Sequence, residues 1–328
     1  MKHLKEWIHL LFKNGKVPRK VLFRVDAGRI YGLSFGHFAR CHLLSKTLKK
    51  YWNTETLFVM QNFPDGIRHA KALGERVLSI YDNSLDWMVY VSESIVFDLP
   101  QGPSKEDLSL AKEKALWVII LDDLNCKVPW AHVVLNSNIL AMPSNYPNSS
   151  KLLLGPDYLI LDERFENVSN KTRKQNDLLN IIITFGGSDL AGLTLNVLKA
   201  LAKKVYCGFV FNVILGPGFK DNGEIDKVAG CFPDKINVFR NPPDLLPFFV
   251  ECNLAICAGG RTMYELNALK VPTIAITSIE HEALTIKVFK EKGMILGGLN
   301  KWDECDFLKQ FEYARSQVKF SHQRYSSD

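Results

Sequence analysis

From residue 21 onward, the chain alternates short apolar runs with longer amphipathic stretches. Five apolar runs bounded by turn residues occupy the first half: VLFRV (21–25), TLFVM (56–60), SIVFDL (94–99), LWVIIL (116–121) and HVVLN (132–136). Helical patterns lie between some of them, over residues 37–50 and 104–114. Strands that alternate with helices predict a parallel sheet covered by helices.

A polar stretch over residues 162–177, DERFENVSNKTRKQND, interrupts this pattern and is the best linker candidate. Five further apolar runs follow it: LLNIIITF (178–185), FVFNVIL (209–215), INVF (236–239), LAICAG (254–259) and VPTIAIT (271–277). Helices are expected between them, over 190–204, 244–251, 260–270 and 281–292. The sequence therefore predicts two Rossmann-like, doubly wound α/β domains, at 21–165 and 178–300, with a helix and tail over 301–328.

Ligands of doubly wound sheets bind at the carboxyl ends of the strands, so we expect a cleft between the two domains. The helix expected after residue 300 packs on either domain, and the sequence does not decide between them.

The first 20 residues have the pattern of a basic amphipathic helix. Its apolar face is formed by four side chains: Leu4, Trp7, Ile8 and Leu11. We favour packing of this face on its own domain or on a partner. The alternative is peripheral contact of residues 1–18 with an anionic membrane surface.

Charge and cysteine content narrow the class of protein. Five of the six net positive charges lie in residues 1–20, so the rest of the chain has no basic face and nucleic-acid binding is not expected. The seven cysteines are scattered without a CxxC pair, which favours free thiols in the cytoplasm and no metal site. We expect a cytoplasmic protein, peripheral to the inner face of the membrane if its first segment binds lipid.

Two glycine-containing loops in the second half are candidate phosphate sites. The first, in ITFGGSD, contains Gly186, Gly187 and Ser188, and a helix is expected after it. Glycines let a phosphate approach the backbone, and a helix N-terminus offers unpaired N–H groups. The alternative is that these glycines serve only the turn.

The second loop, in ICAGGRTMYELNAL, is the stronger signal. Gly259, Gly260, Arg261 and Thr262 place two glycines, a cation and a hydroxyl at one helix start, which suits a pyrophosphate. Glu265 either accepts hydrogen bonds from ribose hydroxyls or only complements the helix dipole. Together the two loops predict a nucleoside diphosphate, and the absence of Walker and GxGxxG motifs disfavours an ATPase or a dinucleotide enzyme.

In the first half, RVDAGRIYGLSFGHFARC follows the first strand. Gly36 permits a close turn, and His37 stands at the helix start, where the dipole disfavours imidazolium and leaves a neutral base. Asp26 either orients His37 or caps a turn. Arg24 and Arg40 either hold anionic parts of the ligand or pair with Asp26.

Acidic residues also end two other strands, Asp98 in IVFDLP and Asp122-Asp123 in IILDDL. We favour turn and loop-holding roles for them over metal binding.

Seven motifs in order resemble one family of nucleotide-sugar enzymes over residues 21–300. They are FRVDAG with GHFARC, IILDDL followed by VVLNSN, LLLGPDYLIL, FGGSD and AGGRTMYELNALKVPTIAI. They resemble the UDP-2,4-diacetamido-2,4,6-trideoxy-altropyranose hydrolases of the pseudaminic-acid pathway, a group that includes spore-coat polysaccharide biosynthesis proteins. More distantly, they are similar to the glycosyltransferase that makes lipid II. The resemblance implies the GT-B architecture, in which two Rossmann-like domains face a central cleft.

The resemblance also implies residue roles. His37 matches the general base that activates water, UDP leaves with inversion, and no metal or cofactor takes part. Gly259 to Thr262 would hold the pyrophosphate and Glu265 the ribose. Glu280 and His281 stand where the family commonly has Asn-Gln, and with Asp98 they are expected on the sugar side.

Three functions are therefore in competition for a chain expected to bind a UDP-sugar. The first is a hydrolase that releases UDP and a free amino-deoxy sugar for surface glycan or sialic-acid-like sugar synthesis. The second is an inverting glycosyltransferase in which His37 deprotonates an acceptor hydroxyl. The third is a binding module without turnover.

Overall fold

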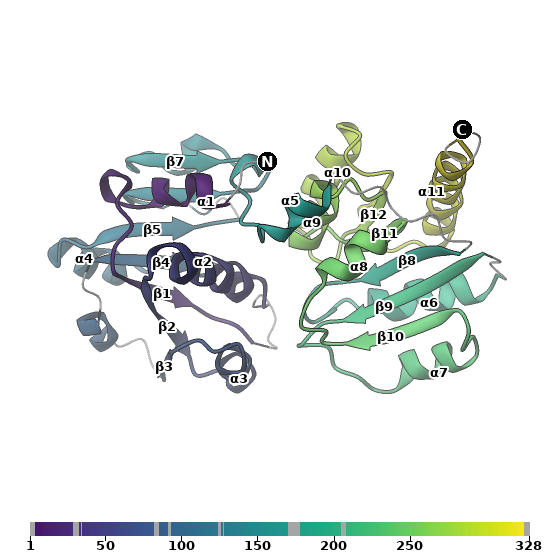
Figure 1. The fold of residues 1–328 in the computed structure, drawn as a ribbon, viewed down its shortest axis with the longest axis horizontal. Helices are drawn as coiled ribbons and strands as arrows, with labels where there is room; N and C mark the ends of the chain where they lie inside the picture. The colour runs from purple at the N-terminus through teal and green to yellow at the C-terminus, as the bar shows by residue number, and fades with distance from the viewer. Residues whose placement is uncertain are drawn as a thin grey trace. The chain divides into compact units, whose positions relative to one another are not determined.

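The computed structural model describes residues 4–28, 33, 35–81, 85–90, 93–123, 126, 128–169, 178–204 and 208–324. The chain forms two compact α/β units, Met1–Glu163 and Arg164–Asp328 (Figure 1). Each unit is built on one parallel sheet and has its own hydrophobic core. The α/β fold class predicted from the alternation of strands and helices is therefore confirmed.

The first unit contains a seven-stranded parallel sheet with the order β3-β2-β1-β4-β5-β6-β7. Its strands are β1 (Lys20–Val25), β2 (Glu55–Gln61), β3 (Val77–Ile80), β4 (Ser94–Asp98), β5 (Trp117–Leu121), β6 (Val133–Asn136) and β7 (Lys151–Leu154). The chain builds outward from β1 on one side and from β4 on the other. Because the order reverses between these two neighbours, the loops that follow them lie together at the carboxyl edge.

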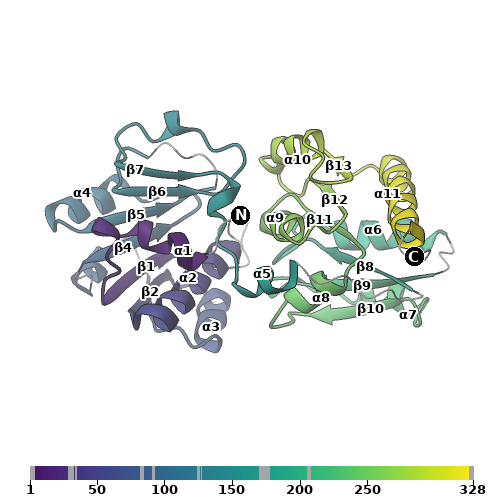
Figure 2. The same cartoon turned by 45° about the horizontal axis from the view of Figure 1, so that its top comes forward.

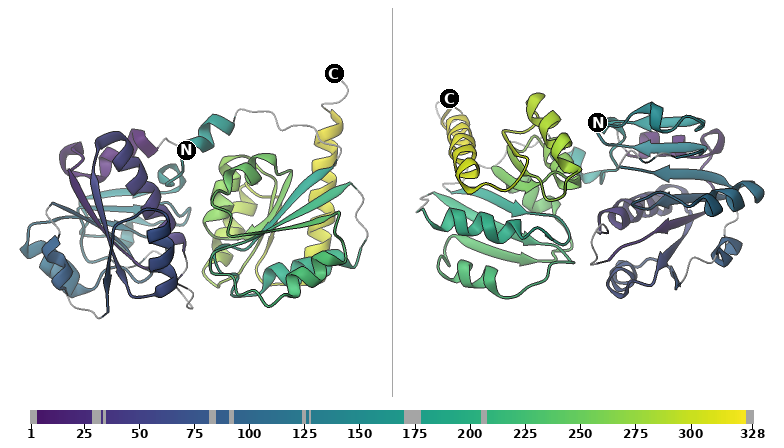
Figure 3. Two further views of the ribbon diagram at one scale, coloured as in Figure 1. Left: turned by 60° about the horizontal axis from the view of Figure 1, so that its bottom comes forward. Right: turned by 180° about the vertical axis from the view of Figure 1, so that it is seen from behind.

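Helices cover both faces of this sheet, and strand side chains point alternately to them. The helices are α2 (Gly36–Trp52), α3 (Pro64–Ala72) and α4 (Lys105–Glu113). Phe23 of β1 packs in the core under α2 and α3, whereas Leu22 packs in the core that includes α4. Figure 3 (left) shows α2 and α4 on opposite faces. Burial on both faces explains why these strands are continuous apolar runs in the sequence.

The N-terminal segment is shorter in regular helix than its pattern predicts. It forms one α-helical turn, α1 (Leu4–Trp7), and the 3₁₀ turns η1 (Ile8–Leu11) and η2 (Lys13–Gly15). Its four apolar residues belong to the core of the first unit, where Trp7 packs edge-to-face on Tyr158 at 5.7 Å. The favoured interpretation, packing on its own domain, therefore holds, and this face is not exposed for a membrane surface. No helix in the described ranges has the length and apolar character needed to cross a bilayer.

The second unit contains a six-stranded parallel sheet with the order β10-β9-β8-β11-β12-β13 (Figure 2). Its strands are β8 (Leu179–Thr184), β9 (Phe209–Leu215), β10 (Ile236–Arg240), β11 (Leu254–Ala258), β12 (Thr273–Ile276) and β13 (Gly297–Leu299). The order reverses between β8 and β11, so the loops after these two strands are neighbours at the carboxyl edge.

The helices of the second unit lie on both faces of its sheet (Figure 3). These helices are α6 (Leu193–Ala202), α7 (Glu224–Gly230), α8 (Leu246–Glu251), α9 (Arg261–Ala268), α10 (Glu282–Glu291) and α11 (Glu304–Arg324). Figure 3 (left) shows α11 and α9 on opposite faces of the sheet. Phe307 and Phe311 of α11 lie in the core of the second unit, so the last helix packs on this unit.

The expected linker is partly helical. Residues Arg164–Ser169 form α5, which packs on α8, and Arg164 forms an ion pair with Asp244 of the same unit. The remainder of the predicted linker, residues 170–177, lies outside the described residues. The short 3₁₀ turns of the first unit are η3 (Asp86–Tyr90), η4 (Pro143–Asn145) and η5 (Pro156–Tyr158).

Candidate functional site

His37 lies in the first turn of α2 with one ring nitrogen already bound. Its Nδ1 lies 2.7 Å from Oδ1 of Asp98, and its side chain is 11% exposed. Two lone pairs at this distance would repel, so Nδ1 carries a proton and donates it to the carboxylate. Nε2 then holds the basic lone pair, and no hydrogen-bond partner for it occurs among the described residues.

Strand register explains why Asp98 reaches His37. Asp98 is the last residue of β4 and pairs in register with Val25 at the end of β1. Side chains alternate along a strand, so Asp98 points to the same face as Val96, which packs in the core under α2. Asp26, one residue beyond Val25, has the opposite parity.

Asp98 is fully buried and bound on both oxygens. Arg40 Nε donates to Oδ2 over 2.6 Å, and Arg40 Nη2 donates to Oδ1 over 2.5 Å. Cys41 Sγ lies 3.3 Å from Oδ2. Arg40 thus pairs with Asp98 and not with Asp26, and the contact of Asp98 with a sugar that the resemblance implied is contradicted by its burial.

The charges around this pair keep Asp98 ionised. Burial opposes ionisation, but the positive charges of Arg40 and His37 and their hydrogen bonds lower the pKa of Asp98 to about 2. Asp98 is therefore a carboxylate at neutral pH. It accepts a hydrogen bond from the Nδ1–H group of His37, and the proton stays on the ring.

The expectation of a neutral imidazole imposed by the helix dipole is wrong in sign. Burial lowers the pKa of His37, and Arg40 lowers it further, but Asp98 and, more weakly, Asp123 raise it. The net pKa of His37 lies above its ordinary value of 6.5. A carboxylate at hydrogen-bond distance outweighs a helix dipole, because its full charge is closer to the ring. His37 is consequently a stronger base than a free imidazole.

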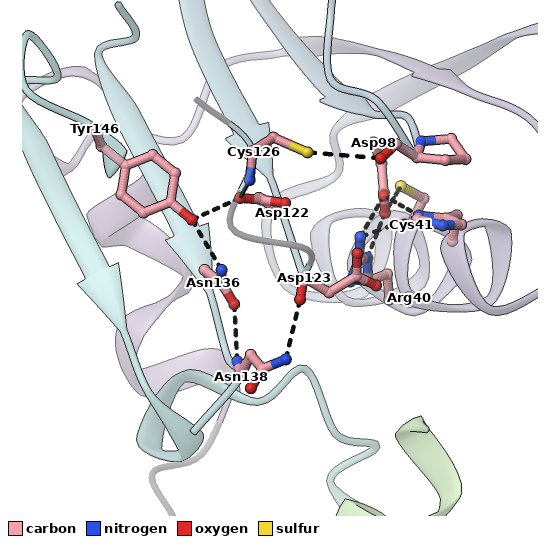
Figure 4. A network of polar contacts seen from close by, with 11 residues as sticks. Arg40, Cys41, Asp98, Asp122, Asp123, Cys126, Asn136, Asn138 and Tyr146 are labelled. Carbon is pink, nitrogen blue, oxygen red and sulfur yellow. Dashed lines mark hydrogen bonds and ion pairs between the residues drawn. The ribbon is translucent and has the colours of Figure 1, made fainter. Parts of the chain in front are cut away.

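Arg40 is held from a third side by the loop after β5 (Figure 4). Its Nη1 donates to Asp123 Oδ2 over 3.0 Å. Asn138 Nδ2 in turn donates to the backbone oxygen of Asp123 over 3.0 Å. The side chain of Asp123 is 41% exposed, in contrast to the buried Asp98.

The neighbouring Asp122 holds the same loop from inside, as the sequence analysis expected. Its Oδ2 accepts hydrogen bonds from Cys126 N over 2.9 Å and from the hydroxyl of Tyr146 over 2.6 Å. Asn136 Nδ2 donates to the same hydroxyl over 2.8 Å. Burial and Asp122 raise the pKa of Tyr146, so the hydroxyl stays a donor at neutral pH. Figure 4 shows the contacts that join Tyr146 to Asp122 and Asn136.

Of the alternatives that the sequence left open for the first-strand residues, the structure has the pairing of Arg24 with Asp26. Arg24 Nη1 donates to Asp26 Oδ1 over 2.6 Å, and the backbone N–H of Gln61 donates to the same oxygen over 2.7 Å. Both charged side chains are buried. Asp26 therefore ties the ends of β1 and β2 together, and the group that orients His37 is Asp98.

In the second unit, Gly186, Gly187 and Ser188 form the loop after β8. Gly186 has φ of +74°, a conformation that favours glycine. Gly216, after β9, lies so close that an added Cβ would come within 2.4 Å of the Gly186 oxygen. Ser188 Oγ is buried and has no hydrogen-bond partner in the described part of the chain. A buried hydroxyl in this state suits an oxygen of a ligand.

The N-terminus of α6 is less accessible than expected. The helix begins at Leu193, and the carboxylate of Asp189 accepts hydrogen bonds from the backbone of Leu193 and Thr194 over 2.9 Å each. Two of the N–H groups that the sequence analysis offered to a phosphate are therefore occupied by the protein.

The loop after β11 leads directly into the N-terminus of α9. Gly260 precedes α9, and within the described ranges no side chain caps this helix. An added Cβ on Gly259 would lie 2.7 Å from Ile286 Cγ1, so α10 packs directly against the loop. An uncapped helix start beside a glycine is an arrangement that suits an anion.

The remaining predicted residues lie on α9 and in the next loop. Arg261 Nε and Glu265 Oε1 form an ion pair at 2.8 Å, so the roles expected for them, pyrophosphate and ribose binding, compete with this pair. Thr262 lies beside them in the first turn. Glu280 and His281 are exposed between β12 and α10. The two glycine loops are brought to neighbouring strand ends, β8 and β11.

Sequence reasoning missed three contributors to these sites. Asp123 was recognised as a strand-end acid but not as the partner of Arg40, and Tyr146 carried no signal. Gly216 stands in GPG after FVFNVIL, which is the same kind of glycine turn as the one containing Gly186. That parallel was the available signal for its position.

The two α/β units define the fold of the GT-B glycosyltransferases. One such structure, the spinosyn rhamnosyltransferase SpnG complexed with thymidine diphosphate, matches with a TM-score of 0.56 over 91% of this chain and 92% of that chain, at 13% identity. This similarity shows the fold, which the sequence resemblance had implied.

Two relatives are closer in sequence. An uncharacterized protein of Methanocaldococcus jannaschii is 27% identical over 257 residues, which are 74% of this chain and 53% of that protein. The spore coat polysaccharide biosynthesis protein SpsG of Bacillus subtilis is 24% identical over 217 residues, 62% of this chain and 60% of SpsG. The chain thus spans between half and two thirds of the length of these relatives. No family model matches the sequence.

Proposed function

We propose that this protein is an inverting nucleotide-sugar enzyme that transfers a glycosyl group to an acceptor hydroxyl. The observation that carries the proposal is the His37–Asp98 pair. A buried, ionised carboxylate fixes the Nδ1 proton, so the neutral ring presents a basic Nε2. Histidine–carboxylate pairs with this geometry act as general bases in unrelated enzymes.

The expected reaction balances as one displacement. Nε2 of His37 takes the proton of the acceptor hydroxyl, whose oxygen forms a bond to the anomeric carbon. The bond from that carbon to the diphosphate oxygen breaks, and its electron pair leaves with the nucleoside diphosphate. Attack opposite the leaving group inverts the configuration. Asp98 stabilises the imidazolium that forms and is not itself protonated.

The second unit would hold the leaving group. Ser188 offers a buried hydroxyl that has no partner among the described residues. Thr262 offers a second hydroxyl, and the start of α9 offers backbone N–H groups. Donors placed around a diphosphate stabilise the charge that develops on it. Arg261 would add a positive charge, at the expense of its contact with Glu265.

Transfer to a hydroxyl is preferred over transfer to water because the fold is that of known glycosyltransferases. Hydrolysis is the second candidate, because the same base can activate water and because SpsG belongs to the family that the sequence motifs resemble. UDP is the expected nucleotide, and an amino-deoxy sugar for surface glycan synthesis is the expected group for either reaction.

The test measures nucleotide release from UDP-, dTDP- and CMP-sugars, with and without sugar and lipid-linked acceptors. Release that requires an acceptor identifies a transferase, and release without one identifies a hydrolase. Nucleotide binding without release in either assay would overturn both and leave a binding module.

Two histidine variants on the same helix complete the design. His37→Gln should abolish release while leaving nucleotide binding intact. His42→Gln is the matched control, because His42 pairs with Glu75 and not with the Asp98 group. Equal activity of the two variants would remove His37 from the mechanism.

A further inference from the structure

Four charged or ionisable side chains alternate in sign from the surface to the candidate base. Asp123 binds Arg40 at 3.0 Å, Arg40 binds Asp98 at 2.5 and 2.6 Å, and Asp98 binds His37 at 2.7 Å. Three segments supply them: the loop after β5, helix α2 and the end of β4. Figure 4 shows three members of this row, Asp123, Arg40 and Asp98.

The guanidinium of Arg40 restrains the carboxylate of Asp98 on both oxygens. Nε and Nη2 contact Oδ2 and Oδ1 respectively, so rotation of the carboxylate would break two charge-assisted bonds. Oδ1 is therefore held on the ring nitrogen of His37. A lysine would keep the charge of Arg40 but could not make this two-point contact.

Arg40 also acts on His37 directly. Its Nη2 lies 3.1 Å from Nδ1, so a positive charge stands beside the ring and opposes imidazolium formation. Asp123 lies on the far side of Arg40, binds its Nη1 and reduces this effect.

We propose that Arg40 and Asp123 are positioning residues for His37, in which Arg40 fixes Asp98 and opposes protonation of the ring while Asp123 offsets the charge of Arg40. This inference rests on the proposed function only for its consequence in catalysis. The charged row itself can be tested without any substrate.

The titratable surroundings of His37 are few in the described part of the chain. Asp98 faces the ring from β4, Arg40 from α2, and Asp123 from the end of β5. Cys41, on α2, contacts Asp98. At the end of β1, Arg24 and Asp26 bind each other. Substitutions of Arg40 and of Asp123 are therefore expected to shift the pKa of His37 in opposite directions.

The test is an NMR titration of the His37 ring in the full chain. Arg40→Gln should raise the pKa of His37, because it removes a neighbouring cation. Asp123→Asn should lower this pKa, because it removes a half-exposed anion that offsets the positive charge of Arg40. Arg68→Gln is the control, because Arg68 is exposed on α3 and contacts Asp65. It should leave the titration unchanged.

A shift of the His37 pKa in the same direction in both variants, or no shift in Asp123→Asn, would overturn the proposal. If Arg40→Gln does not fold, Asp123→Asn still decides. The side chain of Asp123 is 41% exposed, and removing its charge leaves Arg40 paired with Asp98. Arg40→Lys should keep the pKa of His37 near that of the unmodified protein and lower kcat with little change in KM. The acid limb of the pH–rate profile should move with the NMR titration. Opposite NMR shifts in a protein without any nucleotide-sugar turnover would leave this inference standing and remove the proposed function.

Discussion

Replacing Asp98 with Asn tests the His37 arrangement most directly, because the substitution keeps the shape and removes only the charge. Both oxygens of Asp98 accept hydrogen bonds: Oδ1 from His37 and Arg40, Oδ2 from Arg40 and Cys41. An amide places its NH₂ group against a donor in either orientation. The variant therefore cannot satisfy the site.

The proton on the His37 ring should then change place. In Asp98→Asn, the nearest remaining partner of Nδ1 is Arg40 Nη2 at 3.1 Å, which can only donate. Nδ1 becomes an acceptor, and the proton moves to Nε2, the nitrogen required as a base. The same exchange of Asp for Asn in a serine protease triad lowers kcat by about 10⁴. We expect a loss of this order in nucleotide release.

The stability of the variant should fall as well. The pKa of Asp98 is lowered from 3.8 to about 2, which corresponds to about 2 kcal/mol of stabilisation at neutral pH. Loss of one partner in a buried ion pair also leaves Arg40 without its main counter-charge, so we expect a decrease of about 3–5 kcal/mol in the free energy of unfolding. Urea unfolding measures this decrease.

Two measurements decide the case. Nitrogen chemical shifts of the His37 ring report which nitrogen carries the proton, and nucleotide release reports kcat at a temperature where the variant is folded. Retention of the Nδ1 proton in Asp98→Asn, or a kcat within tenfold of the unmodified protein, would refute the reasoning.

Three further outcomes follow from the structure. Trp7→Ala should lower the free energy of unfolding by about 3–5 kcal/mol in urea, because Trp7 is 1% exposed. Lys5 is exposed, so Lys5→Ala should change this free energy by no more than about 0.5 kcal/mol. A similarly small effect of both substitutions would contradict the burial of the N-terminal segment. Gly216→Ala should weaken the binding of a nucleoside diphosphate measured by calorimetry, because the new Cβ displaces the loop after β8. Gly230→Ala is the control, because its added Cβ meets nothing within 4 Å, and it should leave the affinity unchanged. Equal affinities of the two variants would remove the loop after β8 from the site. The pKa of Asp98 is lower in the native state than in the unfolded state, so the native state binds fewer protons. Urea unfolding should therefore show a loss of about 2 kcal/mol in the free energy of unfolding as pH falls from about 4 to 2. The Asp98→Asn variant should not show this loss.

The predicted strands and helices succeeded where burial is two-sided. The runs at β1, β4, β8 and β11 are mostly apolar and almost wholly buried, because helices cover both faces of each sheet. Three edge strands were missed. The strand β3 (VLSI) is only half-buried, β7 lies at the other edge, and β13 (GGL) has two glycines and no periodic side-chain signal.

Helix α3 was also missed, for a reason visible in its packing. Its sequence begins PDG, which is typical of a turn. In the structure, Gly66 lies so close to the backbone of Ala27 that an added Cβ would come within 1.9 Å of the Ala27 oxygen. The glycine is present because the helix touches the loop after β1, a contact that only the folded chain reveals.

The sequence left two roles open for Asp26, orienting His37 or capping a turn, and the structure gives the orienting role to Asp98. Asp26 is 11 positions from His37 in the sequence and Asp98 is 61, so distance along the chain points to the wrong acid. The two differ in parity: Asp98 follows Val96 on the face under α2, whereas Asp26 is out of step with Val25 on that face. Parity could be read from the sequence, but it becomes informative only when β1 and β4 are known to be neighbours, and hydrophobic patterns do not encode strand order.

A right-handed crossover from β1 places α2 over the side chains of odd-numbered β1 residues, and any strand added beside β1 then contributes its last inward-facing residue to the start of that helix. The acid at that position is Asp98, so the orientation of the base follows from the switch in strand order and not from the motif that contains the histidine.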